Sequence, residues 1–261
     1  MRKDYMPAAD TSDMGETGFV EFHWTKIWEQ EGGPKGRIER VARQDEHGVI
    51  TPFLKTLPKG AHLLDGGCGL GDWVLAFDHE GFKTTGLDLS RKTVELLQVR
   101  FPGSDFVAGD IRATGFPDAC FDAYFSWGVF EHFENGPQDC IHEAWRLLKP
   151  GGLLFISVPY DNLRHAVRGA FAHPRPAEGP LRFYQYRFTR AELARELEIG
   201  GFSVDAVHPI HKRQGVLRSL HHEFGLPYGW VLTRGLAALL APLLPSGVFS
   251  HMILAVARKP A

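Results

Sequence analysis

Short apolar runs alternate with stretches of helical spacing through most of the chain. Five strands are expected, at residues 62–64, 82–87, 105–108, 123–126 and 153–158. Helices are expected between them, at about 70–79, 90–100 and 137–148. Short apolar strands that alternate with helices typically form a parallel sheet covered on both faces. The pattern therefore predicts an α/β fold with a doubly wound sheet.

The remaining segments are expected to elaborate this sheet. Thr189 and Glu192 have capping-box spacing at the start of a further helix, and strands are expected at 202–207 and 252–257. Residues 1–18 lack periodicity and are expected to form a flexible arm, whereas 19–57 have helical spacing and are interpreted as a helical lid. We interpret 159–188 and 208–250 as substrate-cap insertions. Residues 19–261 thus form one domain.

Composition and charge narrow the function classes. The 261 residues are 44% hydrophobic and 23% charged, with a formal net charge of -2, which argues against a general nucleic-acid binder. The N-terminus lacks the apolar core of a signal peptide, so a cytoplasmic location is expected. The apolar stretch 229–249 is interrupted by Arg234, Pro242 and Pro245, so stable membrane insertion is not expected. The cysteines and histidines lack metal-ligand spacing, and no metal is expected.

A glycine-rich segment joins the first expected strand of the sheet to the helix that follows it. The candidate ligand-binding residues in this loop are Asp65, Gly67, Cys68, Gly69 and Gly71. Glycines allow a sharp turn and close approach of a ligand to the backbone. A dinucleotide-binding loop would have its third glycine at the position of Asp72, and an acidic residue ahead of the loop favours an ammonium or sulfonium ligand over a pyrophosphate.

Later strand ends supply further candidate ligand contacts. Asp88, followed by Leu89, is placed to accept hydrogen bonds from ribose hydroxyls, as in any adenosine-binding site. Asp110 can accept from an adenine amino group, and Ile111 offers an apolar surface to the ring. The next strand ends in Ser126 and Trp127, close to where the reactive end of the ligand is expected.

These motifs, in this order, resemble the class I S-adenosylmethionine (SAM)-dependent methyltransferases, in particular the small-molecule group. The resemblance covers roughly 61–159 and the closing strands. It implies SAM as the cofactor, with its methionine part at the glycine-rich loop, and a seven-stranded sheet whose last strand is antiparallel. Gly66 replaces a β-branched apolar residue common in the family, which we interpret as a change that loosens the loop.

Methyl transfer to an oxygen or nitrogen atom of a small molecule, such as a metabolite, sugar or lipid-like compound, is the expected activity. His132 is the candidate general base; a structural histidine is the alternative. Substrate contacts are expected from Trp24, Trp28, Tyr160, His165 and Tyr184, although the two tryptophans also suit core packing. The arginines of the 159–188 segment are candidates for a substrate carboxylate or phosphate, namely Arg164, Arg168, Arg175, Arg182 and Arg187.

Two other functions compete with methyl transfer. One is an NAD(P)-dependent oxidoreductase, disfavoured by the missing dinucleotide glycine; the other is a SAM-binding protein that regulates or cyclises without transferring a methyl group. The leucine-rich stretch 231–244 suits a roof over an apolar pocket, a contact in a homodimer or a membrane surface, but a buried cap helix is the favoured interpretation.

Overall fold

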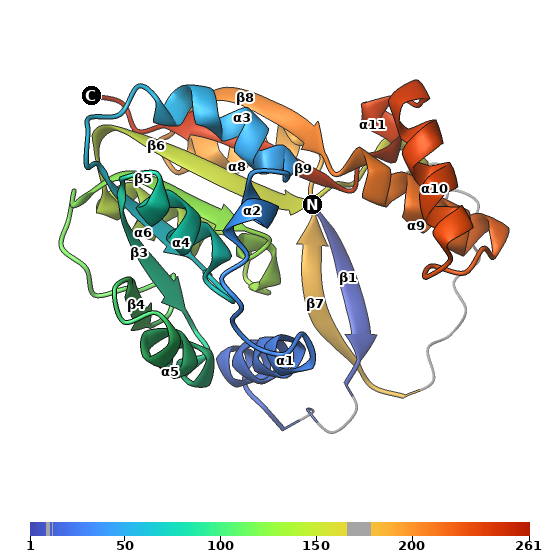
Figure 1. Ribbon diagram of the computed structural model, residues 1–261, viewed down its shortest axis with the longest axis horizontal. Coiled ribbons are helices and arrows are strands. Elements are labelled where there is room, and N and C mark those ends of the chain that lie inside the picture. Colours follow the sequence, from blue (N-terminus) through green and yellow to red (C-terminus); the bar gives the residue numbers. More distant parts are fainter. Residues whose placement is uncertain (9–10, 12, 166–178) are drawn as a thin grey trace.

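The computed structural model describes residues 1–8, 11, 13–165 and 179–261. A seven-stranded sheet lies at its centre, with helices on both faces (Figure 1). In spatial order, its strands are β4 (Asp105–Ala108), β3 (Lys83–Asp88), β2 (His62–Gly66), β5 (Phe121–Trp127), β6 (Leu148–Pro159), β9 (Met252–Arg258) and β8 (Ser203–Ile210). β9 is antiparallel to both β6 and β8, and the other pairs are parallel. The predicted sheet is therefore confirmed.

Helices cover the two faces of this sheet in separate groups. One group contains α2 (Ile38–Val41), α3 (Asp45–Leu54) and α4 (Asp72–His79); the other contains α6 (Gln138–Leu147) and α8 (Arg190–Ile199). Leu63 packs in the first group's core and Leu64 in the second, because successive strand side chains point to opposite faces. Both are fully buried, which explains the unbroken apolar runs in the strands.

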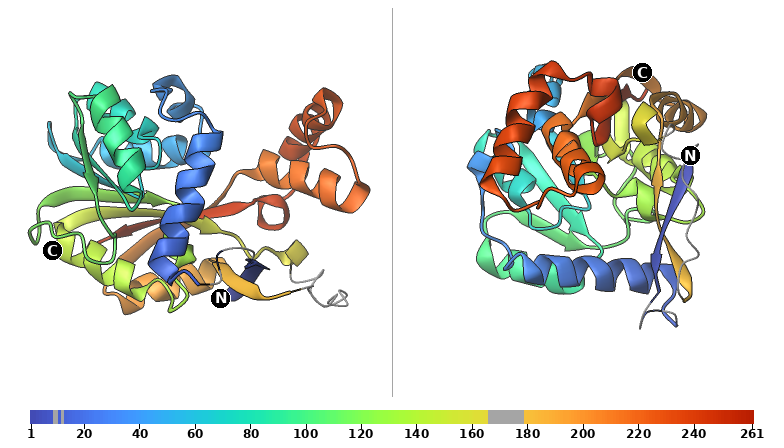
Figure 2. Two further views of the ribbon diagram at one scale, coloured as in Figure 1. Left: turned by 90° about the horizontal axis from the view of Figure 1, so that it is seen from below. Right: turned by 90° about the vertical axis from the view of Figure 1, so that its right-hand side faces the viewer.

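Two elements lie beside the carboxyl ends of the strands. α1 (Glu16–Gln30) crosses there and contacts α5 (Arg91–Arg100), and the short helix η2 (Phe130–His132) follows β5. α1 is the long blue helix in both views of Figure 2. It corresponds to the first part of the predicted helical lid. Its position allows it to form one side of a ligand site at the strand ends.

The flexible arm predicted for residues 1–18 is wrong for residues 2–7. Residues 2–7 form β1 (Arg2–Pro7), which pairs antiparallel with β7 (Leu181–Arg187) from Arg2 opposite Arg187 to Pro7 opposite Leu181. An ion pair between Asp4 and Arg187 joins the strands at 2.5 Å. The local pattern missed β1 because its partner lies about 180 residues away in the sequence. β7 is a regular strand within the predicted insertion 159–188, of which Arg168 and Arg175 lie outside the described residues.

The segment 208–250 contains a helical projection. It is built by α9 (Lys212–Phe224), α10 (Val231–Leu240), η3 (Ala241–Leu243) and α11 (Ser246–Phe249), which extend away from the sheet (Figures 1 and 2). The favoured interpretation of a buried helix is wrong, because Val231, Leu232 and Leu239 of α10 are 83%, 80% and 69% exposed. Within the described ranges, no helix combines the length and hydropathy that a bilayer crossing requires.

Candidate cofactor and active site

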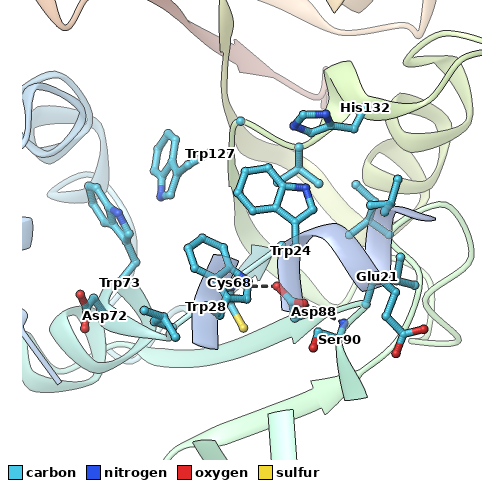
Figure 3. A pocket seen from close by; sticks show the side chains of 18 of the residues that line it. Glu21, Trp24, Trp28, Cys68, Asp72, Trp73, Asp88, Ser90, Trp127 and His132 are labelled. Atoms are coloured by element: carbon cyan, nitrogen blue, oxygen red, sulfur yellow. Dashed lines mark hydrogen bonds between the residues drawn. The ribbon is translucent and has the colours of Figure 1, made fainter. Parts of the chain in front are cut away.

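A cavity of about 260 Å³ opens where α1 faces the carboxyl ends of β2, β3 and β5 (Figure 3). It lies at the edge of the sheet where open α/β folds bind ligands. Of the predicted site residues, those that line it are Trp24, Trp28, Gly67, Cys68, Gly69, Asp88, Leu89, Asp110, Ile111, Trp127 and His132. Segments far apart in the sequence thus meet in one site.

The glycine-rich loop forms the floor of this cavity. Gly67 and Gly69 have φ angles of +86° and +51°, in the left-handed region that favours glycine. A Cβ atom on Gly69 would lie 2.8 Å from the Trp28 ring, and one on Gly67 would lie 2.4 Å from the Val129 side chain. The indole of Trp28 therefore packs directly on the loop, and only glycine permits that approach.

Gly66 makes room for a buried tyrosine, which corrects the view that it merely loosens the loop. A Cβ atom at this position would lie 2.3 Å from the Tyr124 hydroxyl oxygen and 2.4 Å from its ring. Tyr124 is fully buried in β5, so its ring cannot swing into solvent. The usual β-branched side chain is therefore excluded by the size of the residue behind it.

Gly66→Val is expected to destabilise the fold by about 2–3 kcal/mol, as overpacking of a dense core does. Urea unfolding followed by circular dichroism measures the effect. The double variant Gly66→Val/Tyr124→Leu is the control, because removing the ring's outer atoms should recover part of the loss. A Gly66→Val protein as stable as the wild type would contradict the packing described for Tyr124.

Two buried carboxylates lie beside the glycine-rich loop. Asp88 accepts hydrogen bonds from the backbone N–H groups of Gly69 and Ser90, both at 2.8 Å. Burial raises the pKa of Asp88, and these two hydrogen bonds oppose the rise. Asp65 is 1% exposed, and neither carboxylate oxygen has a hydrogen-bond partner among the described residues. Burial, and then the charge of Asp88, hold the pKa of Asp65 well above its usual range.

This pair of acids fits a positively charged adenosyl ligand. A buried carboxylate without a partner is costly, and a nearby cation would compensate it. An ammonium or sulfonium group supplies such a charge, whereas a pyrophosphate would add repulsion. Asp88 also lines the cavity, and each of its oxygens retains a lone pair for a ribose hydroxyl. The residues present therefore fit the cofactor that the sequence implies.

Asp110 lines the cavity but already has a strong partner. Its carboxylate accepts hydrogen bonds from the Arg112 backbone and side chain, the closest at 2.7 Å. Those hydrogen bonds lower the pKa of Asp110 against the opposing effect of burial. The Arg112 side chain also donates a hydrogen bond to the carboxylate of Glu16 in α1, at 2.7 Å. Asp110 thus helps to anchor α1, and its contact with adenine stays a prediction.

One face of α1 forms the wall opposite the loop. Val20, Trp24 and Trp28 lie four residues apart and all line the cavity, together with Glu21. The rings of Trp24 and Trp28 are stacked, with centroids 5.2 Å apart. Sequence reasoning found the tryptophans but missed Val20 and Glu21, although the same four-residue spacing includes Val20. It also missed Arg37 and Asp72, which line the cavity near the start of α4.

His132 lies at the other end of the cavity from Asp88 (Figure 3). Its ring is 5.3 Å from that of Trp24, and Nδ1–H donates to the Tyr184 carbonyl oxygen at 2.8 Å. This tautomer leaves Nε2 unprotonated. Burial lowers the pKa of His132 to about 4, so the imidazole is neutral at physiological pH. Glu131 Oε1 lies 3.9 Å from Nε2, and burial raises the pKa of that carboxyl to about 8.

The other predicted site residues do not line this cavity. They are Asp65, Gly71, Ser126, Tyr160, His165 and Tyr184. Ser126 is buried and donates to the Gly66 carbonyl oxygen at 2.6 Å. Tyr160 is buried in the core, and its contact with the substrate stays a prediction. Tyr184 packs on His132 with centroids 5.2 Å apart, and His165 lines a second cavity.

Part of the chain matches a known protein family. Residues 64–156 match the methyltransferase domain family. The chain is 30% identical over 160 residues, 61% of its length, to a probable S-adenosylmethionine-dependent methyltransferase of Mycolicibacterium smegmatis, of which it covers 58%. It spans less than two thirds of the length of this and other curated relatives.

Two solved structures share the fold over nearly the whole chain. One is a 1,6-didemethyltoxoflavin-N1-methyltransferase of Burkholderia thailandensis with bound 1,6-didemethyltoxoflavin and S-adenosylhomocysteine, at 18% identity, a TM-score of 0.60, and 100% and 96% coverage of the two chains. The other is the cyclase SpnF, at 21% identity, a TM-score of 0.60, and 94% and 96% coverage. These findings show that residues 64–156 form a methyltransferase domain, and that the chain is similar in sequence to SAM-dependent methyltransferases and shares the fold of these two structures.

Proposed function

We propose that this protein transfers the methyl group of SAM to an oxygen or nitrogen atom of a small-molecule acceptor. The observation that carries the proposal is the pair of buried carboxylates, Asp65 and Asp88, beside a glycine-rich loop that a Cβ atom would obstruct. The negative charge of these two carboxylates disfavours binding of the pyrophosphate of a nicotinamide cofactor. The family match also counts against the oxidoreductase alternative.

Each part of the cavity has a proposed task in holding the cofactor. Asp88 accepts from the ribose hydroxyls, and Asp65 compensates the positive charge of the methionine part. Ile111 offers an apolar surface to the adenine ring, and Trp28 closes the loop from above. When bound, SAM supplies an electrophilic methyl group with a neutral thioether as its leaving group. The protein's main contribution is then to orient the acceptor and exclude water.

The acceptor is proposed to bind near His132 and Trp24. His132 lines the end of the cavity away from Asp88, and its ring is in contact with that of Trp24. The unprotonated Nε2 of His132 suits it to remove a proton from an acceptor hydroxyl or ammonium group. An aromatic surface of this size favours a flat or apolar acceptor. The Burkholderia enzyme, which holds 1,6-didemethyltoxoflavin beside S-adenosylhomocysteine, supports a small-molecule acceptor on this fold.

Calorimetry and a methyl-transfer screen test the proposal. SAM and S-adenosylhomocysteine should bind the full chain, and NAD should not. Radiolabelled SAM should then label at least one member of a set of hydroxylated, amino and carboxylic aromatic compounds. Binding of NAD but not S-adenosylhomocysteine would refute the cofactor assignment. Binding of SAM with no label transferred to any acceptor would favour a protein that uses the cofactor without transferring its methyl group.

A further inference from the structure

A second cavity, of about 420 Å³, is lined mainly by cationic and imidazole side chains. Four arginines contribute to it, namely Arg2, Arg164, Arg187 and Arg218. They come from β1, the segment after β6, β7 and α9. His165 and His251 also line this cavity. Five segments separated in sequence therefore bring basic groups to one hollow.

Carboxylates balance three of these four guanidinium groups. Arg187 pairs with Asp4 at 2.5 Å and Arg164 with Glu223 at 2.9 Å. Arg2 lies 3.7 Å from Asp161.

Arg218 differs from the other three. Its side chain forms no ion pair or hydrogen bond with the residues that the structure describes, and its buried Nε has no partner. Four guanidinium groups thus face three carboxylates, and one positive charge remains. A buried N–H donor without an acceptor is costly, and an anion at this position would supply the acceptor and balance the charge.

The histidines show the same excess of positive charge. Burial, and then the guanidinium groups of Arg187 and Arg164, lower the pKa of His165 to about 3. Burial, and then Arg218 and Arg187, lower the pKa of His251 to about 3. Both imidazoles are therefore neutral at physiological pH and can hydrogen-bond a ligand without adding charge.

Tyr184 lies near residues of both cavities. Its ring packs on His132, which lines the first cavity. Its hydroxyl lies within electrostatic reach of Arg218 and Asp4, which line the second. Burial raises the pKa of Tyr184, the charge of Glu131 adds to this, and the charge of Arg218 opposes it. The second cavity is therefore linked through Tyr184 to the surroundings of the proposed general base.

We propose that the second cavity binds an oxyanion group of the acceptor, a phosphate or a carboxylate, through Arg218 with Arg187 and the neighbouring histidines. Guanidinium groups recognise both oxyanions through paired N–H donors. This inference rests on the proposed function, because it assigns the acceptor to anionic small molecules. The group to be methylated would then lie on the His132 side of Tyr184.

Calorimetry with inorganic phosphate and with acetate tests this site at constant ionic strength, using the full chain. Saturable binding of at least one anion is expected. Arg218→Gln should weaken it by about tenfold or more, because a charge-assisted hydrogen-bonding partner is lost. Arg213→Gln is the matched control, since Arg213 is an exposed arginine of the same helix and its loss should change affinity less than twofold. The anion that binds more tightly indicates whether the acceptors in a screen should carry a phosphate or a carboxylate group.

The controls separate this proposal from the proposed function. S-Adenosylhomocysteine affinity should stay within twofold in both variants, which also shows that they fold. Arg218→Lys keeps the charge but loses the forked donors, so it should weaken binding by less than Arg218→Gln, and it provides the test should that variant not fold. Absence of saturable anion binding, or equal losses in Arg218→Gln and Arg213→Gln, would overturn the site. Cofactor binding that persists in that case leaves the methyltransferase proposal standing.

Discussion

Asp88→Asn is expected to weaken the affinity for S-adenosylhomocysteine by about 100-fold. The substitution keeps the size of the side chain but removes the charge from a group proposed to accept two hydrogen bonds from the ribose. Charge-assisted hydrogen bonds contribute about 1.5–3 kcal/mol each, and each 1.4 kcal/mol is a tenfold change in affinity. Calorimetric titration of the purified variant measures the loss.

The same substitution disturbs the loop itself. Asp88 accepts from the backbone N–H groups of Gly69 and Ser90, and an amide would turn its NH2 group toward one of them. A loss of about 1–2 kcal/mol in the free energy of unfolding is therefore expected as well. Asp105→Asn is the matched control on the neighbouring strand, because Asp105 accepts from Thr85 outside the lining of the cavity.

A ligand comparison separates ribose recognition from loop damage. The wild-type protein should bind adenosine more tightly than 2′-deoxyadenosine, because one proposed contact of Asp88 is missing in the second ligand. Asp88→Asn should bind the two with nearly equal affinity. If the variant still prefers adenosine by the wild-type factor, Asp88 does not contact the ribose. A loss of cofactor affinity as large in Asp105→Asn would point to general destabilisation.

The central sheet and the cofactor loop could be predicted because their signals are local. Each strand is a short apolar run, and the residues from Asp65 to Gly71 stand together at one strand end. β1 could not be found in this way, because its polar residues form a strand only through pairing with β7. A strand at a small two-stranded sheet carries little hydrophobic pattern of its own.

Packing partners explain the other errors. Gly66 is conspicuous in the sequence, but only the structure shows that Tyr124 occupies the space beside it. Tyr160 was selected for its aromatic ring, and only the structure shows that it packs in the core at 8% exposure. Arg218 carried no signal at all, since its significance depends on arginines contributed by three other segments. Residue types are visible in a sequence, whereas their neighbours are fixed by long-range packing.

His132→Ala is expected to lower turnover by about 10²–10³-fold once an acceptor is known, within the usual contribution of a general base. S-Adenosylhomocysteine affinity should change little, because His132 lies at the end of the cavity away from Asp88. Steady-state rates and calorimetry on one preparation measure both quantities. His142→Ala is the control, since His142 is exposed on α6. Turnover within threefold of the wild type would assign His132 a purely structural role.

The pH profile distinguishes a base from a merely positioned ring. Because burial lowers the pKa of His132 to about 4, its neutral form persists well below the ordinary titration range of histidine. The base-dependent rate should therefore be level through pH 6 and 7 and fall only as the pH approaches about 4. A fall centred near 6.5 would mean that another, exposed histidine is the base.

Ionisation of Glu131 is expected to cause a second change in rate, at higher pH. Its carboxyl, with a pKa raised to about 8, is mostly protonated at neutral pH and becomes an anion 3.9 Å from Nε2 of His132 as the pH rises. That charge stabilises the imidazolium that forms when His132 takes a proton, so the rate should rise through pH 8. Glu131→Gln removes the titrating group and should abolish this rise while the limb near pH 4 remains. A rise of unchanged size in Glu131→Gln would assign it to ionisation of the acceptor, because the variant has no carboxyl at that position.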